Sequence, residues 1–93
     1  MDDRSRPRLA GKARLRRDQV TGKSLLLYPE RGLALNDTAA EILTLCTGEA
    51  TIAEIIDQLA RKYGAEQRPA LEAEVRAFLQ SLVDRNLLQG MEP

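Results

Sequence analysis

Residues 24–46 constrain the fold most strongly, because signals for two strands, a tight turn and a helix follow one another there without interruption. Residues 25–28 are apolar and lead into Pro-Glu-Arg-Gly, in which proline presets φ and glycine accepts unusual backbone angles. Leu33 and Leu35 then stand two residues apart, the spacing that places both side chains on one face of a strand. The segment therefore predicts an antiparallel hairpin that runs directly into a helix.

A first helix is predicted after the hairpin, from its caps and from an apolar stripe. Asn36, Asp37 and Thr38 all favour the N-cap position, and Thr38 with Glu41 has the spacing of a capping box. Gly48 is a candidate for a left-handed C-cap. The apolar stripe consists of Ala39, Ile42, Leu43 and Cys46.

Two further helices follow. Thr51 and Glu54 repeat the capping-box spacing, and Gly64 marks the end of the helix that they begin. After a linker through Pro69, a last helix is predicted to close near Asn86. The stripes of these two helices are Ile52, Ile55, Ile56, Leu59 and Tyr63, and then Leu71, Val75, Phe78, Leu79, Leu82 and Val83.

The predicted strands all precede the helices. Residues 13–18 allow a first strand with Leu15 pointing inward, and a loop at Thr21 and Gly22 returns the chain into residues 25–28. We therefore predict an α+β fold with winged-helix-like element content, in which a three-stranded antiparallel sheet is followed by three helices.

The length and composition fit one domain. Its 93 residues suffice for a single modest core, which is mainly aliphatic because the chain has no Trp, one Phe and two Tyr. Residues 1–12 are rich in Arg and lack apolar periodicity, which predicts a flexible N-terminal arm. The domain is expected over residues 13–88, and residues 89–93 are expected to form a C-terminal tail.

The three consecutive leucines at 25–27 cannot share one face of a strand. We predict that Leu25 and Leu27 lie beneath the helices with the leucines of the next strand, so that Leu26 and Tyr28 point outward. Outward apolar side chains are either scattered surface residues or a contact surface for a partner or a second copy.

Several chemistries lack their usual residues. With no His and one Cys, the sequence has no disulfide framework and no cluster of the usual ligands for zinc, iron or copper. Catalytic triads need a base beside a nucleophile, and Cys46 lies on an apolar helix stripe, where a buried, inert thiol is expected. No signal peptide or membrane-spanning run is evident, so a cytoplasmic location is expected. We interpret the chain as a binding module and not an enzyme.

The net charge of zero conceals an asymmetry. Residues 1–35 carry nine Lys or Arg against four acids, whereas residues 36–93 carry five against ten. Either the two halves attract each other within the fold, or a basic strand surface and an acidic helical surface face different partners. A winged-helix regulator that binds nucleic acid is the alternative function, but the predicted helices mix acids with bases, whereas a recognition helix is rich in Lys and Arg.

The third predicted strand offers a binding edge. In the order first, second, third, residues 32–35 would lie at an edge with unpaired backbone groups, where an extended peptide can add as a strand. The last helix is the candidate wall beside it. The alternative is that the edge is short and binds no peptide, with Arg31 and Asn36 protecting it from pairing.

The sequence also resembles the family of pyrroloquinoline quinone (PQQ) biosynthesis protein D, PqqD. The resemblance covers residues 7–88 and is carried by Leu-Tyr-Pro-Glu at 27–30, Leu-Asn at 35–36, Thr-Ala-Ala-Glu-Ile-Leu at 38–43, and Gly48. Glu74 and Asn86 stand where Asp and Gly are common in the family, which affects only the end of the last helix.

The resemblance implies a RiPP recognition element that binds the ribosomal precursor peptide PqqA, presents it to the radical SAM enzyme PqqE and does no chemistry itself. S-adenosylmethionine and the iron–sulfur cluster would belong to the enzyme, so this chain would need no cofactor. The peptide would lie as an added strand against Gly32, Leu33, Ala34 and Leu35, with a wall formed by Leu71, Val75 and Leu79. Leu26 and Tyr28 are candidates for contact with the enzyme, and the chain is expected to be a monomer or a weak, strand-exchanged homodimer.

Overall fold

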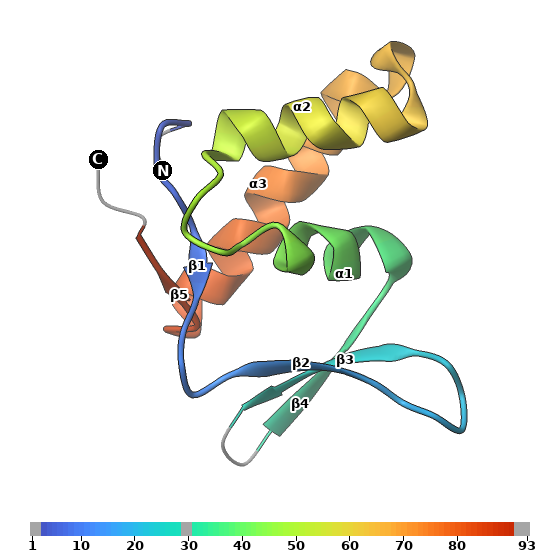
Figure 1. Ribbon diagram of the computed structural model, residues 1–93, viewed down its shortest axis with the longest axis vertical. Helices are drawn as coiled ribbons and strands as arrows, with labels where there is room; N and C mark the ends of the chain where they lie inside the picture. The colour runs from blue at the N-terminus through green and yellow to red at the C-terminus, as the bar shows by residue number, and fades with distance from the viewer. Residues whose placement is uncertain (1–2, 29–30, 91–93) are drawn as a thin grey trace.

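The computed structural model describes residues 3–28 and 31–90, apart from the side chain of Arg31. Three strands form an antiparallel sheet on one side, and three helices cover one of its faces (Figure 1). The strands of this sheet are β2 (Arg14–Arg17), β3 (Ser24–Tyr28) and β4 (Arg31–Leu35). The helices are α1 (Asp37–Thr44), α2 (Ile52–Tyr63) and α3 (Arg68–Asp84), with a short 3₁₀ turn at Ala65–Gln67. The predicted α+β fold, a three-stranded antiparallel sheet followed by three helices, is confirmed.

The helix boundaries follow local capping chemistry. Asn36, and not Thr38, is the N-cap of α1, because its side-chain oxygen accepts a 2.8 Å hydrogen bond from the backbone N–H of Ala39. The capping box predicted for α2 is present, since Thr51 and Glu54 satisfy each other's backbone N–H groups. Helix α3 begins one residue before Pro69, which was predicted to lie in the linker; proline is well tolerated in the first turn of a helix.

The end of α1 differs from the prediction. Gly48 has φ +88°, as a left-handed cap requires, but the helix already ends at Thr44 with Leu45 as its C-cap. The backbone N–H of Gly48 instead donates to the carbonyl of Pro7 at 3.0 Å. Gly48 therefore shapes the loop that holds the N-terminal segment.

The register of the hairpin corrects the predicted sheet faces. Tyr28 pairs with Arg31, so Leu26 lies directly opposite Leu33, and opposite residues share a face. Leu26 has no exposed surface, whereas Leu25 and Leu27 keep part of theirs on the other face. The prediction that Leu26 and Tyr28 point outward was therefore wrong.

The two ends of the described chain pair with each other in a second small sheet. Strand β1 (Arg8–Leu9) lies antiparallel to β5 (Leu88–Gln89), and the N–H of Arg6 donates to the carbonyl of Gly90 at 3.1 Å. Ser5 is only 1% exposed. The described part of the predicted N-terminal arm thus packs against the helices, as does the start of the predicted tail at residue 89. Residues 1, 2 and 91–93 lie outside the described residues.

The core is aliphatic, as the composition indicated. It joins one residue of the central strand to the inner stripes of all three helices, and Leu33, Leu35, Tyr28 and Phe78 pack against it while partly exposed. Its largest fully buried side chains are Leu26, Ile42, Ile52, Ile55, Ile56, Leu59, Val75, Leu79, Leu82 and Leu87. None of the described helices is long and apolar enough to span a bilayer.

Candidate functional site

Strand β4 is an edge of the main sheet. The strand order is β2-β3-β4, so among the described residues no other strand pairs with the outer side of β4. Gly32 and Ala34 are exposed on the face of the sheet that points away from the helices, while Leu33 and Leu35 point toward the core. The edge at residues 32–35 is therefore present as predicted, with small side chains that leave its backbone accessible.

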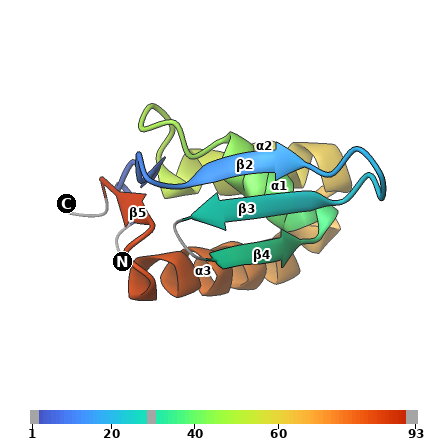
Figure 2. The same ribbon diagram turned by 90° about the horizontal axis from the view of Figure 1, so that it is seen from below.

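Helix α3 runs beside this edge. Viewed from below, β4 is the strand of the main sheet that lies along α3 (Figure 2). The three side chains predicted to form the wall, however, are core residues: Leu71 is 6% exposed, and Val75 and Leu79 have no exposed surface. These side chains pack α3 against the core, so any surface of α3 that a ligand contacts must lie on a flank of the helix.

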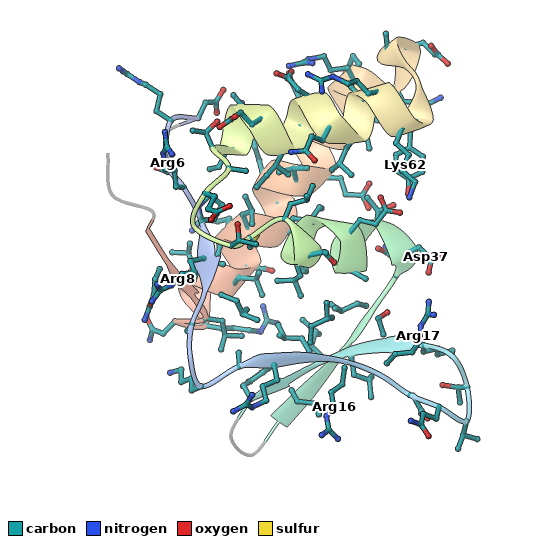
Figure 3. The ribbon with its side chains drawn as sticks, in the orientation of Figure 1. Arg6, Arg8, Arg16, Arg17, Asp37 and Lys62 are labelled. Atoms are coloured by element: carbon teal, nitrogen blue, oxygen red, sulfur yellow. The ribbon has the colours of Figure 1, made fainter. Side chains whose placement is uncertain are left out.

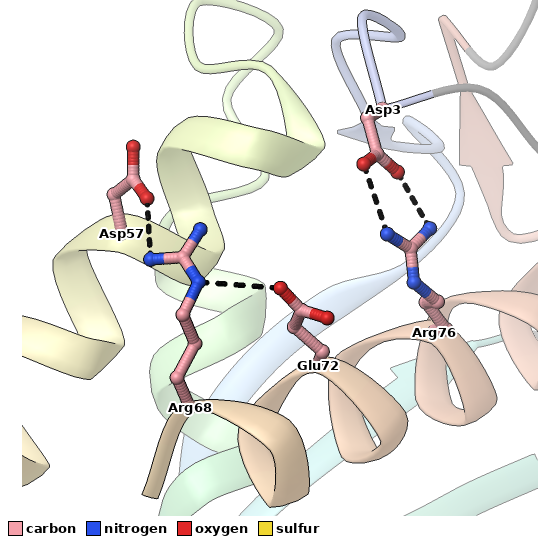
Figure 4. A network of polar contacts seen from close by, with 5 residues as sticks. All are labelled: Asp3, Asp57, Arg68, Glu72 and Arg76. Atoms are coloured by element: carbon pink, nitrogen blue, oxygen red, sulfur yellow. Dashed lines mark hydrogen bonds and ion pairs between the residues drawn. The ribbon is translucent and has the colours of Figure 1, made fainter. Parts of the chain in front are cut away.

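One flank of α3 is already occupied by ion pairs (Figure 4). Arg68 bridges Asp57 of α2 at 2.7 Å and Glu72 at 3.2 Å. Arg76 donates two hydrogen bonds, of 2.5 and 2.9 Å, to the carboxylate of Asp3. These bonds hold the pKa of Asp3 below its ordinary value. They also fasten the N-terminal segment to the helix.

The opposite flank of α3 carries Glu74, Phe78 and Ser81 at helical spacing. Phe78 packs against the core but remains partly exposed, and Ser81 donates to the carbonyl of Phe78 at 2.7 Å. Sequence reasoning placed Phe78 in the core stripe and missed its position at the stripe's margin. The sequence did hold one signal for this position, because Phe78 is the only aromatic residue in a helix that otherwise buries aliphatic side chains.

The remaining predicted site residues lie elsewhere. Leu26 has no exposed surface to offer a partner, and Tyr28 is only partly exposed against the core. Cys46 donates from its Sγ to the carbonyl of Ile42, and burial raises its pKa to about 12, so the thiolate form is scarce at neutral pH. Within residues 3–28 and 31–90, no group of His, Cys, Asp and Glu is arranged to hold a metal ion.

The fold is shared with two proteins of known structure. The solution structure of the PqqD truncation of Methylobacterium extorquens PqqCD superposes with a TM-score of 0.74 and 34% identity, covering 89% of this chain and 87% of that one. That protein is described as a functional, stand-alone recognition element for ribosomally synthesised and post-translationally modified peptides (RiPPs). TbiB1, solved in complex with the TbiA(beta) leader peptide, has the same fold, with a TM-score of 0.74 at 22% identity over 92% of this chain and 99% of that one. The chain thus shares the fold of a RiPP recognition element.

The chain belongs to the PqqD family, because the family model described as coenzyme PQQ synthesis protein D matches residues 23–88. A PqqA binding protein of Rhodopseudomonas palustris (strain HaA2) is 46% identical over 88 residues, which is 95% of this chain and 85% of the relative. A bifunctional coenzyme PQQ synthesis protein C/D of Methylorubrum extorquens is 38% identical over 89% of this chain but only 22% of its own length. The resemblance noted in the sequence is confirmed.

Proposed function

We propose that this chain binds the precursor peptide PqqA as an added strand at the outer edge of β4 and presents it to the radical SAM enzyme PqqE. The observation that carries the proposal is the unpaired edge of β4 beside α3. An exposed strand edge offers main-chain hydrogen bonds to any extended peptide, and neighbouring side chains add selectivity. Several relatives that share most of this chain are named PqqA binding proteins, which supports PqqA as the peptide.

The register identifies which backbone groups are available. Two residues separate Tyr28 from Arg31, and the pair that closes a two-residue hairpin is a hydrogen-bonded one. Hydrogen-bonded and non-hydrogen-bonded pairs alternate along an antiparallel ladder. We therefore infer that Leu33 bonds to β3, whereas Gly32 and Ala34 direct their N–H and C=O groups outward to the peptide.

The second contact is the flank of α3 that faces away from the ion pairs. Arg68 and Arg76 occupy the side toward α2 and the N-terminal segment, so Phe78 and Glu74 lie on the side left for a ligand. A peptide strand added to β4 points alternate side chains to the helix side of the sheet. An apolar side chain there would cover the exposed part of Phe78, and a basic one would meet Glu74.

The proposed role is presentation without chemistry. Holding the peptide in one extended conformation beside the enzyme lowers the entropy cost of its binding to the enzyme and raises its local concentration there. S-adenosylmethionine and the iron–sulfur cluster would be carried by the enzyme. We place this assembly in the cytoplasm, with the chain acting as a monomer or a weak, strand-exchanged homodimer.

The test is an NMR titration of labelled protein with PqqA, repeated with two substitutions at one position. Ala34→Pro removes an outward N–H, whereas Ala34→Val keeps it and alters only the outer-face side chain. We expect amide shifts in residues 32–35 and along α3 for the wild type, near-normal binding for Ala34→Val, and binding roughly tenfold weaker for Ala34→Pro.

Leu33→Pro is the control for the register. It removes a donor of the β3–β4 ladder, so it should unfold the hairpin and reduce binding to peptide and to PqqE alike. A folded Ala34→Pro variant with wild-type affinity for PqqA would refute strand addition at β4. Shifts confined to other elements would refute the site.

A further inference from the structure

The main sheet has a second open edge, at β2, which the proposed peptide site does not use. Among the described residues, β2 pairs only with β3, so its outer side lacks a strand partner. All four of its residues, Arg14–Arg17, are exposed. Lys12 and Lys23 stand exposed beside its two ends. The edge is therefore accessible along its whole length and strongly basic.

The arginines of β2 are not neutralised within the fold. None of Arg14, Arg16 and Arg17 forms an ion pair or side-chain hydrogen bond with another described residue. The nearby Asp18 accepts a 2.8 Å hydrogen bond from the N–H of Val20 and so serves the turn that follows β2. By contrast, Arg68 and Arg76 on α3 are both paired with carboxylates. Three arginines of the N-terminal half, Arg14, Arg16 and Arg17, are thus gathered without ion-pair partners among the described residues at one edge.

The register assigns these side chains to two faces. Arg14 and Arg16 lie opposite Leu27 and Leu25, on the face that points away from the helices, while Leu15 and Arg17 lie on the helix side. Figure 3 agrees, because Arg17 points toward the start of α1, where Asp37 lies, and Arg16 points to the opposite side.

A hollow flanks β2 on each face. One depression, of about 620 Å³, lies beside Arg16, Leu25 and Leu27 of the outer face and reaches around the edge of β2, because Leu15 and Arg17 also line it. On the helix side, one of about 550 Å³ lies between β2 and α1, and its lining includes Leu15, Arg17, Asp37 and Glu41. The carboxylate of Glu41 is held by Lys62 Nζ at 2.8 Å and by the hydroxyl of Tyr63 at 2.7 Å, which lowers its pKa. The outer face therefore suits acids, and the helix side suits apolar or neutral side chains.

The charges select among possible occupants. A second copy pairing through the same edge would place arginines opposite arginines, which is unfavourable. Nucleic acid would find phosphate contacts, but no described residue of β2 or of the outer face of β3 is aromatic, so bases lack a stacking surface. Asp37 beside the helix-side hollow would also repel phosphate. An extended protein segment with alternating acids meets none of these obstacles.

We propose that the β2 edge is a docking surface for an extended acidic segment of a partner protein, which adds as a strand with its acids opposite Arg14 and Arg16. Apolar side chains of the same segment then face Leu15 on the helix side. This surface is independent of the peptide site, because β3 separates the two edges. It gives the domain a second partner surface that stays open while a peptide occupies β4.

The probe is a capped peptide in which Glu and Val alternate over about eight residues, with the corresponding Lys and Val peptide as its control. NMR titration should show amide shifts at residues 14–17, 25 and 27 with the Glu peptide and none with the Lys peptide. Raising the ionic strength from about 0.02 M to about 0.3 M should weaken the binding severalfold, because it screens exposed charges.

Charge reversal gives a matched comparison. Arg16→Glu should weaken binding of the Glu peptide about fivefold. The double variant with Arg14→Glu and Arg16→Glu should weaken it about twentyfold. Arg61→Glu reverses the charge of an exposed residue on α2 and should leave binding of the Glu peptide unchanged. PqqA titrated into the same variants reports separately on the β4 site and should bind normally.

Four results would overturn the proposal: no binding of the Glu peptide at millimolar concentration, equal binding of the Lys peptide, shifts at β4 in place of β2, or full binding to the double variant. Tighter binding of a duplex oligonucleotide at the same arginines would assign the edge to nucleic acid instead. A dimer that Arg16→Glu dissociates would assign it to a second copy.

Discussion

Neighbouring leucines of β3 give the sharpest test of the sheet register. Leu26 has no exposed surface and lies in the core cluster, so Leu26→Ala removes buried carbon atoms and leaves a cavity. Such core truncations cost about 2–5 kcal/mol. Leu25 lies on the other face, opposite Ala34 and Arg16, and is already partly exposed. We expect Leu25→Ala to cost about 1 kcal/mol or less, since only part of its surface leaves an apolar environment.

Urea denaturation followed by circular dichroism measures both variants under the same conditions. With an m-value near 1.5 kcal/mol/M, a loss of about 3 kcal/mol lowers the midpoint by about 2 M, whereas a loss of about 1 kcal/mol lowers it by about 0.7 M. A domain of this size has only about 5–14 kcal/mol of stability, so Leu26→Ala should remove a large share of it. Equal midpoints for the two variants, or a larger loss for Leu25→Ala, would mean that the faces are reversed and would refute the register.

Four other predictions test the caps, the chain ends and the buried thiol. Thr51→Ala should cost about 1 kcal/mol in urea denaturation, because it removes the capping box of α2. Asp3→Asn should lower the free energy of unfolding at pH 7. The difference in free energy from the wild type should disappear as the pH falls below about 3.8, because the lowered pKa of the Asp3 carboxyl stabilises the fold only while that carboxyl is charged. A difference that persists in acid would assign the loss to packing. Gly90→Ala should lower the melting temperature more than Gly22→Ala. Both glycines have positive φ, but only at Gly90 would a Cβ collide with a backbone carbonyl. Equal losses would contradict the pairing of the two chain ends. Cys46 should react with a thiol reagent only after unfolding.

The loop between β3 and β4 shows how far sequence can predict a face. Both strands were evident from residues 25–35, although Arg31 and Gly32, predicted in the turn, belong to β4, and residues 29–30 lie outside the described residues. The face of each leucine depends on whether the number of residues between the strands is even or odd. A two-residue loop pairs each even-numbered residue of β3 with an odd-numbered residue of β4, so Leu26 must share a face with Leu33. Leu25 and Leu27 were predicted to share a face with Leu33, an arrangement that requires an odd number of residues in the loop. The parity rule would have corrected it without coordinates.

The chain ends were harder to predict, because their structure depends on distant partners. Residues 8 and 9 have no apolar periodicity of their own and form a strand only because Leu88 and Gln89 lie beside them. The segment just before them also satisfies a backbone group of α2, because the N–H of Ile52 donates to the carbonyl of Ser5 at 3.0 Å. Contacts between the two ends of a sequence leave no local signal, so composition alone suggested an arm.

The burial of the residues predicted to form the wall has a separate physical cause. A stripe at helical spacing predicts which side chains are buried, and the stripe of α3 is fully used by the core, as Val75 and Leu79 show. The same side chains cannot also contact a ligand unless the core opens. A helix that both completes a core and borders a site must use the margin of its stripe for the second task, and on α3 the margin away from the ion pairs carries Phe78.

Salt dependence should distinguish the two edges of the sheet. The edges of β2 and β4 are separated by two strand spacings, about 9.5 Å, so partners on both can be accommodated at once. The proposed binding at β4 would use main-chain hydrogen bonds of Gly32 and Ala34, which salt screens little. The proposed binding at β2 would use the exposed arginines of that strand and should weaken steeply as ionic strength rises. If PqqA binding to the isolated domain were as salt-sensitive as binding of the acidic probe, the peptide would have to use the β2 edge, and the assignment of two partners to two edges would fail.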